Sequence, residues 1–151
     1  MVDQKREREL NDALELFYFA YRSFTAGPDR MLASRGLQRM HHRILYFVGR
    51  NPGLSVGDLL GILAVSKQAV NAPLRQLTEL GLVETATDAR DRRIKRLSLS
   101  HAGARLERRL SGSQRDRLGS LFGELGARPE ADWREVMARI AEETPGRGGT
   151  A

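Results

Sequence analysis

The chain has 151 residues, of which 40% are hydrophobic and 29% charged, a composition that suits one folded domain with extensions. It contains no cysteine, which excludes disulfides, thiolate metal sites and cysteine-based redox sensing. No apolar run reaches the roughly 18 residues that a membrane-spanning helix needs. The charged N-terminus MVDQKREREL also lacks the apolar region of a secretory signal, so we expect a cytoplasmic protein without membrane association.

The net charge of +6 is concentrated in the middle of the chain. Residues 34–110 carry 14 basic and 6 acidic side chains, whereas residues 1–33 and residues 111–151 each have a net charge of −1. A basic centre of this kind is typical of a core that binds a polyanion, with ends that serve another purpose. A solvated basic face would give the same count.

Residues 3–26 are predicted to form the first helix, because apolar side chains from Leu10 to Phe24 repeat at steps of three and four. The middle of this helix is apolar on all sides, so we expect it to be buried on more than one side. Gly27-Pro28 is expected to end it. A second helix is expected over residues 37–50, followed by the breaker Asn51-Pro52-Gly53.

Two short helices are predicted next, over residues 55–63 and 67–80. Ser55 and Asp58 form a capping-box pattern, Ser66 can cap the second of these helices, and Gly81 can end it. The hydrophobic period then changes from 3.6 to 2, which predicts antiparallel strands at 82–85 and 94–99 joined by a charged hairpin. Ser100 can cap a long helix over about 101–126, and a last helix is expected over about 129–143.

Helix 55–63, a short turn and helix 67–80 have the spacing of a helix-turn-helix, whose second helix enters the major groove of DNA. Such paired helices also occur in folds that do not bind DNA. Phosphate contacts are expected from the helix start and a lysine, adenine contacts from two amides, and phosphate or guanine contacts from an arginine. The predicted residues are Ser66, Lys67, Gln68, Asn71 and Arg75.

The charged hairpin strengthens this prediction, since a helix-turn-helix followed by a two-stranded ribbon with a cationic tip is a winged helix. The minor groove of a duplex is narrow and electronegative, and it attracts inserted arginine side chains. Asp88 and Asp91 are predicted to hold neighbouring guanidinium groups through paired hydrogen bonds. The predicted DNA-binding residues of the wing are Arg90, Arg92, Arg93 and Lys95.

Residues 53–103, which read GLSVGDLLGILAVSKQAVNAPLRQLTELGLVETATDARDRRIKRLSLSHAG, resemble the winged-helix core of the MarR family of bacterial transcription regulators. The stretches LGLVE, DARDRR and LSLSHAG are the most specific parts. The resemblance implies a mainly α fold with a small two- to three-stranded antiparallel β wing. It also implies an obligate homodimer on a palindromic operator. We therefore expect an N-terminal dimerisation helix (1–33), a winged helix-turn-helix core (34–100), C-terminal dimerisation helices (101–145) and a disordered tail (146–151).

Pro73 departs from the pattern of the family, which usually has helix formers in the middle of the recognition helix and often a basic residue at the position of Ala72. Pro73 removes the amide that would bond to the Ala69 carbonyl, so it should kink or locally open the helix. A winged-helix protein-interaction module without DNA binding is therefore the alternative prediction. An RNA-binding protein is disfavoured, because the basic region lacks exposed aromatic residues for base stacking.

The resemblance further implies that a small aromatic or anionic effector relieves repression by binding between the dimerisation helices and the winged core. The candidate pocket residues are Phe17, Tyr21, Phe24, His41, His42 and Tyr46, although aromatic residues at helical spacing are more often part of a core. Neighbouring histidines point about 100° apart on a helix, so we expect no metal and no other cofactor. Nucleotide-binding and zinc-protease motifs are absent, so we do not expect an enzyme. The resemblance to the MarR family implies a transcriptional regulator, which we expect to be a repressor.

Overall fold

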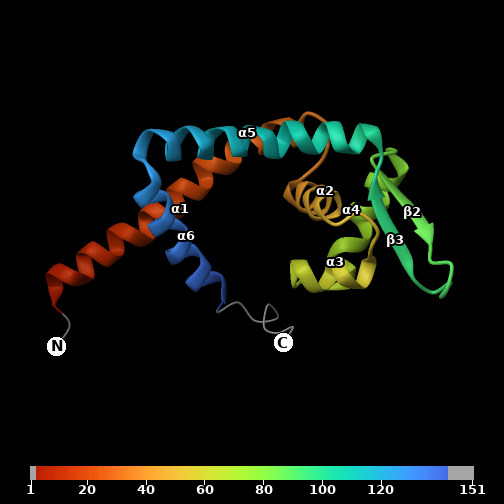
Figure 1. Ribbon diagram of the computed structural model, residues 1–151, viewed down its shortest axis with the longest axis horizontal. Coiled ribbons are helices and arrows are strands. Elements are labelled where there is room, and N and C mark those ends of the chain that lie inside the picture. Colours follow the sequence, from red (N-terminus) through yellow and green to blue (C-terminus); the bar gives the residue numbers. More distant parts are fainter. Residues whose placement is uncertain (1–2, 143–151) are drawn as a thin grey trace.

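The computed structural model describes residues 3–142. These residues form six helices and one three-stranded antiparallel sheet, which confirms the expected mainly α fold with a small β wing. In Figure 1 the long helix α5 joins a winged-helix core at one end to α1 and α6 at the other. The predicted tail 146–151 lies outside the described residues. In chain order the elements are α1 (Gln4–Ala33), α2 (Arg39–Arg50), β1 (Leu54–Ser55), α3 (Val56–Leu63), α4 (Lys67–Glu79), β2 (Val83–Thr87), β3 (Lys95–Leu99), α5 (His101–Leu125) and α6 (Ala127–Glu142).

The hydrophobic core lies around α2, which packs against α4, β3 and α5. Its members come from every element of the winged core, from the end of α1 and from the first half of α5. Among residues 3–142, no helix is both long enough and apolar enough to cross a membrane. The largest fully buried side chains are Leu32, Ile44, Leu45, Leu59, Leu77, Leu97 and Leu110.

The predicted end of the first helix at Gly27-Pro28 is wrong. Pro28 is buried inside α1, which continues to Ala33 and places Leu32 in the core. The missing amide of a proline removes one helical hydrogen bond. Residues that follow Pro28 in α1 nevertheless make contacts that hold the last turns of the helix in place. Arg39 of α2 donates to the Asp29 carboxylate, with Nη2 2.8 Å from Oδ2, so tertiary contacts outweigh the local breaker.

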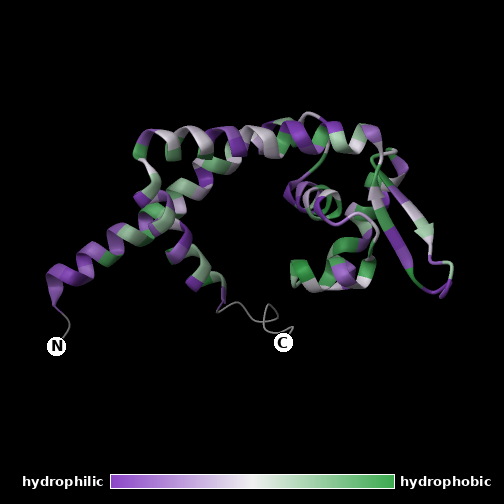
Figure 2. Cartoon of the chain, in the orientation of Figure 1, coloured by the Kyte–Doolittle hydropathy of each residue, from purple (hydrophilic) through white to green (hydrophobic). Residues whose placement is uncertain are grey.

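The expected burial of the first helix on more than one side is also not found within the single chain. All side chains from residue 4 to residue 23 are exposed, and Leu14 and Phe17 keep 69% and 52% of their surfaces accessible. Figure 1 shows that the N-terminal half of α1 extends away from the winged core. Figure 2 shows hydrophobic residues along this helix and along α6. Within the described part of the chain, no other segment buries these hydrophobic residues of α1.

The sheet has the strand order β1-β3-β2, and β1 is a strand that the sequence pattern did not predict. It pairs only two residues, with Leu54 opposite Leu97 and Ser55 opposite Arg96. The hairpin β2–β3 is paired from Val83 opposite Leu99 to Thr87 opposite Lys95. In Figure 1 this hairpin projects beyond the helices, with its tip at the end of the molecule farthest from α1.

Candidate nucleic-acid interface

The turn between α3 and α4 is built by side-chain caps. Ser55 and Asp58 form the predicted capping box, with the Asp58 amide 3.0 Å from Ser55 Oγ and the Ser55 amide 3.2 Å from Asp58 Oδ2. Ala64 ends α3 in the left-handed conformation at φ 52°. Ser66 Oγ then accepts a hydrogen bond from the Ala69 amide and starts α4. These local contacts produce the helix-turn-helix spacing that the sequence predicted.

The orientation of α4 is set by Val70 and Leu77, which are fully buried against the core. The opposite side of the helix is open, and all five predicted residues of this segment are exposed there: Ser66, Lys67, Gln68, Asn71 and Arg75. The helix runs without interruption from Lys67 to Glu79, so Pro73 does not break it. The predicted kink at Pro73 stays a prediction.

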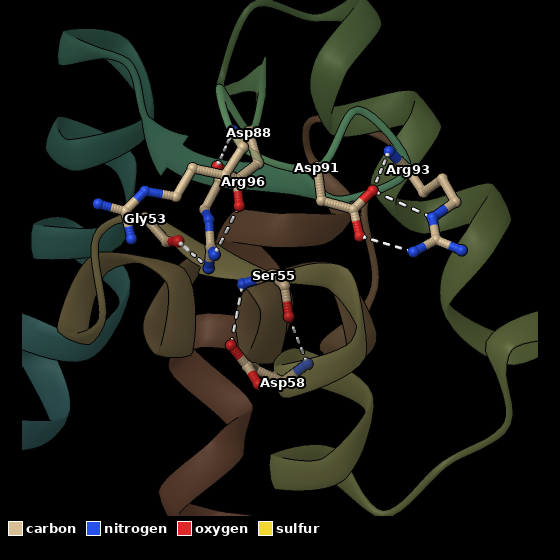
Figure 3. A network of polar contacts seen from close by, with 8 residues as sticks. Gly53, Ser55, Asp58, Asp88, Asp91, Arg93 and Arg96 are labelled. Atoms are coloured by element: carbon tan, nitrogen blue, oxygen red, sulfur yellow. Dashed lines mark hydrogen bonds and ion pairs between the residues drawn. The ribbon is translucent and has the colours of Figure 1, made fainter.

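The loop of the wing is held by Asp91, as predicted (Figure 3). Its Oδ1 accepts from the backbone amide and from Nε of Arg93, and its Oδ2 accepts from Nη2, all at 3.0 Å. These hydrogen bonds lower the pKa of Asp91 below its ordinary range and raise the pKa of Arg93. The Arg93 side chain is 90% exposed, so the pair adds little stability. Its physical effect is to restrict the guanidinium group to one orientation.

Asp88 acts differently from the prediction, because its guanidinium partner lies across the hairpin. Its Oδ1 accepts from the Arg90 amide at 3.1 Å, and its Oδ2 accepts from Arg96 Nη2 at 3.1 Å. The Arg90 amide, followed by Arg96, lowers the pKa of Asp88. Arg96 also donates to the Gly53 carbonyl beside β1, so it ties the wing to the turn before α3 (Figure 3). Sequence reasoning missed Arg96, although strand alternation places it on the hairpin.

The remaining predicted wing residues are exposed. Lys95 Nζ donates to Thr87 Oγ1, its neighbour across the hairpin, at 3.0 Å. Within residues 3–142, the guanidinium groups of Arg90 and Arg92 have neither an ion pair nor a hydrogen bond. The tip therefore presents two arginine side chains that are available to an external anion, beside a third that is held in place.

A cavity of about 260 Å³ lies between α1, α2 and α5. Four of the six predicted pocket residues line it, namely Tyr21, Phe24, His42 and Tyr46. Phe17 and His41 do not line this cavity. Phe17 lies farther along the exposed part of α1, and the His41 ring is buried within the core.

The cavity also contains two arginine side chains that the prediction did not include. Arg39 is paired with Asp29, which raises the pKa of Arg39. Arg43 Nη2 is 3.3 Å from the Tyr21 hydroxyl. His42 is hydrogen-bonded to Ser111 Oγ of α5 at 2.9 Å, and its burial lowers its pKa. Among residues 3–142, no three histidine, aspartate or glutamate side chains lie close enough to share a metal ion.

The chain is similar to members of a known protein family. The model of the MarR family matches residues 35–94, which span α2, the helix-turn-helix, β2 and the loop of the wing. The HTH-type transcriptional regulator PetP of Rhodobacter capsulatus is 42% identical over 136 residues, which cover 90% of this chain and 82% of PetP.

Solved structures have the same fold. The crystal structure of MarR is similar with a TM-score of 0.66 and 25% identity, over 89% of each chain. A Staphylococcus aureus MepR–DNA complex is similar with a TM-score of 0.69 and 18% identity, over 86% of this chain and 96% of MepR. The protein therefore belongs to the MarR family, whose members are transcription regulators and not enzymes.

Proposed function

We propose that this regulator is a homodimeric, sequence-specific DNA-binding repressor that acts in the cytoplasm and is released from its operator by a small effector. The observation that carries the proposal is the pairing of an open face on α4 with a wing whose tip presents free guanidinium groups. Both belong to one compact core, because α4 packs directly against β2. In this proposal residues 34–100 bind DNA, and the helices on either side of them assemble the dimer.

The side chains of α4 have the chemistry for the major groove. Gln68 and Asn71 carry amides that can pair with adenine, and Arg75 can pair with guanine or a phosphate. Ser66 and Lys67 stand at the helix start, where free amides and a positive charge favour a phosphate. The MepR structure was solved as a DNA complex. That resemblance supports the fold of a DNA-binding protein, and the choice of residues comes from their exposure.

The wing is proposed to enter the neighbouring minor groove. Arg90 and Arg92 are exposed and unpaired among the described residues, so neither has to break an ion pair before it meets the DNA. Arg93 is already held by Asp91. A minor groove of negative potential attracts such side chains, and its width selects the sequence without base-specific hydrogen bonds.

The dimer is supported by the apolar surface that the single chain leaves uncovered. On α1 this surface includes Leu10, Leu14 and Phe17, and on α6 it includes Val136 and Ile140. An apolar patch spread over two helices is typical of a protein–protein interface. A twofold dimer would present two recognition helices and two wings, and its operator would be palindromic.

The effector is proposed to occupy the cavity between α1, α2 and α5. Tyr21, Phe24 and Tyr46 supply aromatic walls, and Arg43 supplies donors for an anion. A volume of about 260 Å³ is suited to a molecule with a single ring. A phenolic or benzoate-type compound should raise the melting temperature and weaken DNA binding, whereas an Arg43→Ala variant should lose both responses.

The test of the proposal is a footprint on the promoter region next to the gene of this protein. We expect protection of a palindromic site at nanomolar protein, and reduced protection by an Arg92→Ala variant. Binding that fails to occur at low salt, while the protein is folded and dimeric, would favour the alternative of a protein-interaction module.

A further inference from the structure

His41 is one of only two polar side chains that are buried among residues 3–142, and the proposed DNA contacts do not use it. Only 4% of its surface is accessible. Its Nδ1 lies 2.9 Å from the backbone amide of Gln38, and its Nε2 lies 2.6 Å from Oε1 of Gln76. The ring therefore joins the start of α2 to α4, the helix that is proposed to read the bases.

The tautomer of His41 follows from these two partners. A backbone amide can only donate, so Nδ1 accepts from Gln38 and carries no hydrogen. The hydrogen of the neutral ring is therefore on Nε2, which donates to the amide oxygen of Gln76. One nitrogen completes the capping box of α2, and the other makes a directional contact with α4. The two nitrogens thus have separable roles.

The position of Gln76 makes this contact important for base reading. It lies about one turn after Ala72 and two turns after Gln68, on the flank of α4 between its buried and open faces. Val70 and Leu77 attach the helix by apolar packing, which is non-directional. A helix has a radius of about 5 to 6 Å with its side chains, so a roll of about 10° moves a side-chain tip by about 1 Å. A shift of that size is enough to spoil a paired hydrogen bond to a base edge.

We propose that His41 and Gln76 are positioning residues for sequence recognition, and that their hydrogen bond fixes the rotation of α4 about its axis. The inference rests on the proposed function, because it assigns a role within DNA binding. Neither residue touches the DNA in this scheme. Loss of the bond leaves the minor-groove contacts of the wing and the phosphate contacts of the helix start, so it reduces base discrimination by α4 more than it reduces affinity for any duplex.

Two substitutions at His41 separate the two nitrogens. In His41→Asn the side-chain oxygen takes the place of Nδ1, so the cap on Gln38 is retained and the contact with Gln76 is lost. In His41→Gln the side-chain amide takes the place of Nε2, so the contact with Gln76 is retained and the cap is lost. Gln76→Met removes the acceptor from the other side, at an exposed position of α4. It leaves the Nε2–H of the buried His41 ring without its partner, which costs about 1 to 3 kcal/mol of stability.

The experiment selects bound duplexes from a random-sequence pool with the wild-type protein and these three variants, and measures the melting temperature of each. We expect His41→Asn and Gln76→Met to lose about tenfold in preference for the selected site, the order of one lost bidentate base contact. Their affinity for random duplex should remain within about twofold of wild type. His41→Gln should keep the wild-type preference while losing more thermal stability than His41→Asn, because a cap is lost.

Each outcome decides the proposal. It is overturned if His41→Asn and Gln76→Met select the wild-type site with wild-type strength, or if preference follows melting temperature across all four proteins. The Gln76→Met result alone decides the matter if the His41 variants do not fold. A folded wild-type protein that selects no site would overturn the proposed function, and this inference with it.

Discussion

Gly103 lies where α5 crosses the chain just before the wing, and replacing it with alanine should destabilise the protein. Its amide donates to Ser100 Oγ in the first turn of α5. A Cβ at this position would lie 1.9 Å from the carbonyl oxygen and 2.9 Å from the carbonyl carbon of Leu82. Ordinary contact begins at about 3.4 Å, so α5 and Leu82 would have to separate by about 1.5 Å. The obstacle is backbone, so no side-chain rotation relieves it.

The magnitude follows from two opposing effects. Overpacking costs about 1 to 3 kcal/mol and occasionally more, and a rigid backbone neighbour favours the upper end. Alanine in place of glycine in a helix recovers about 1 kcal/mol. We therefore expect Gly103→Ala to lose about 2 kcal/mol or more, which lowers the melting temperature by roughly 4 to 8 °C for a chain of this size.

The assay is thermal unfolding followed by circular dichroism at one protein concentration, with Gly112→Ala as the matched control in the same helix. The nearest atom to a Cβ at Gly112 is Arg115 Nη2 at 3.9 Å, so this variant should gain up to about 1 kcal/mol. Equal stabilities for Gly103→Ala and the wild type would refute the close approach of α5 to Leu82.

Three further predictions address other parts of the molecule. Pro73→Ala restores an amide that can donate to the Ala69 carbonyl, so it should raise the free energy of unfolding, measured with urea, by about 1 kcal/mol or more and change operator affinity; unaltered values of both would exclude strain at Pro73. Burial lowers the pKa of His42 from its ordinary 6.5, so its neutral form is favoured in the fold, and stability should fall as pH drops through 6.5 towards the folded pKa. In His42→Gln the urea midpoint should change less with pH over that window. The same pH dependence as in the wild type would contradict the role of His42. Phe17→Glu places a charge on the exposed apolar face of α1. In sedimentation it should convert the proposed homodimer to monomers, whereas Lys5→Glu should not.

The parts of the fold that sequence reasoning predicted are those determined by local chemistry. Ser55, Ser66 and Ser100 all cap the helices that follow them, because a hydroxyl next to a helix start has few better partners. Gly81 adopts φ 71° between α4 and β2, as expected for a left-handed end residue. The bidentate pair between Asp91 and Arg93 is equally local, since its members are two residues apart.

The parts that were missed depend on contacts between distant segments. α1 passes through Pro28 because Leu32 is buried and Asp29 meets Arg39 of another helix. The strand β1 has two residues and exists only because β3 lies beside it. Arg96 meets Asp88 across the hairpin, and His41 meets a residue 35 positions away. Among residues 3–142, no segment covers the apolar face of α1.

The central claim is that the wing binds DNA through the side chains of Arg90 and Arg92, which are unpaired among the described residues. The salt dependence of DNA affinity tests this claim most directly. The measurement is fluorescence anisotropy of a duplex from the promoter next to the gene, titrated at several salt concentrations with wild type, Arg92→Ala and Arg128→Ala. Arg128 lies on α6, at the other end of α5 from the wing (Figure 1). Arg128→Ala therefore removes the same charge as Arg92→Ala at a position remote from the wing. We predict that Arg92→Ala weakens binding and reduces the slope of log affinity against log salt by about 1, while Arg128→Ala changes neither. Identical behaviour of the two variants, or no binding by the wild type, would contradict the account.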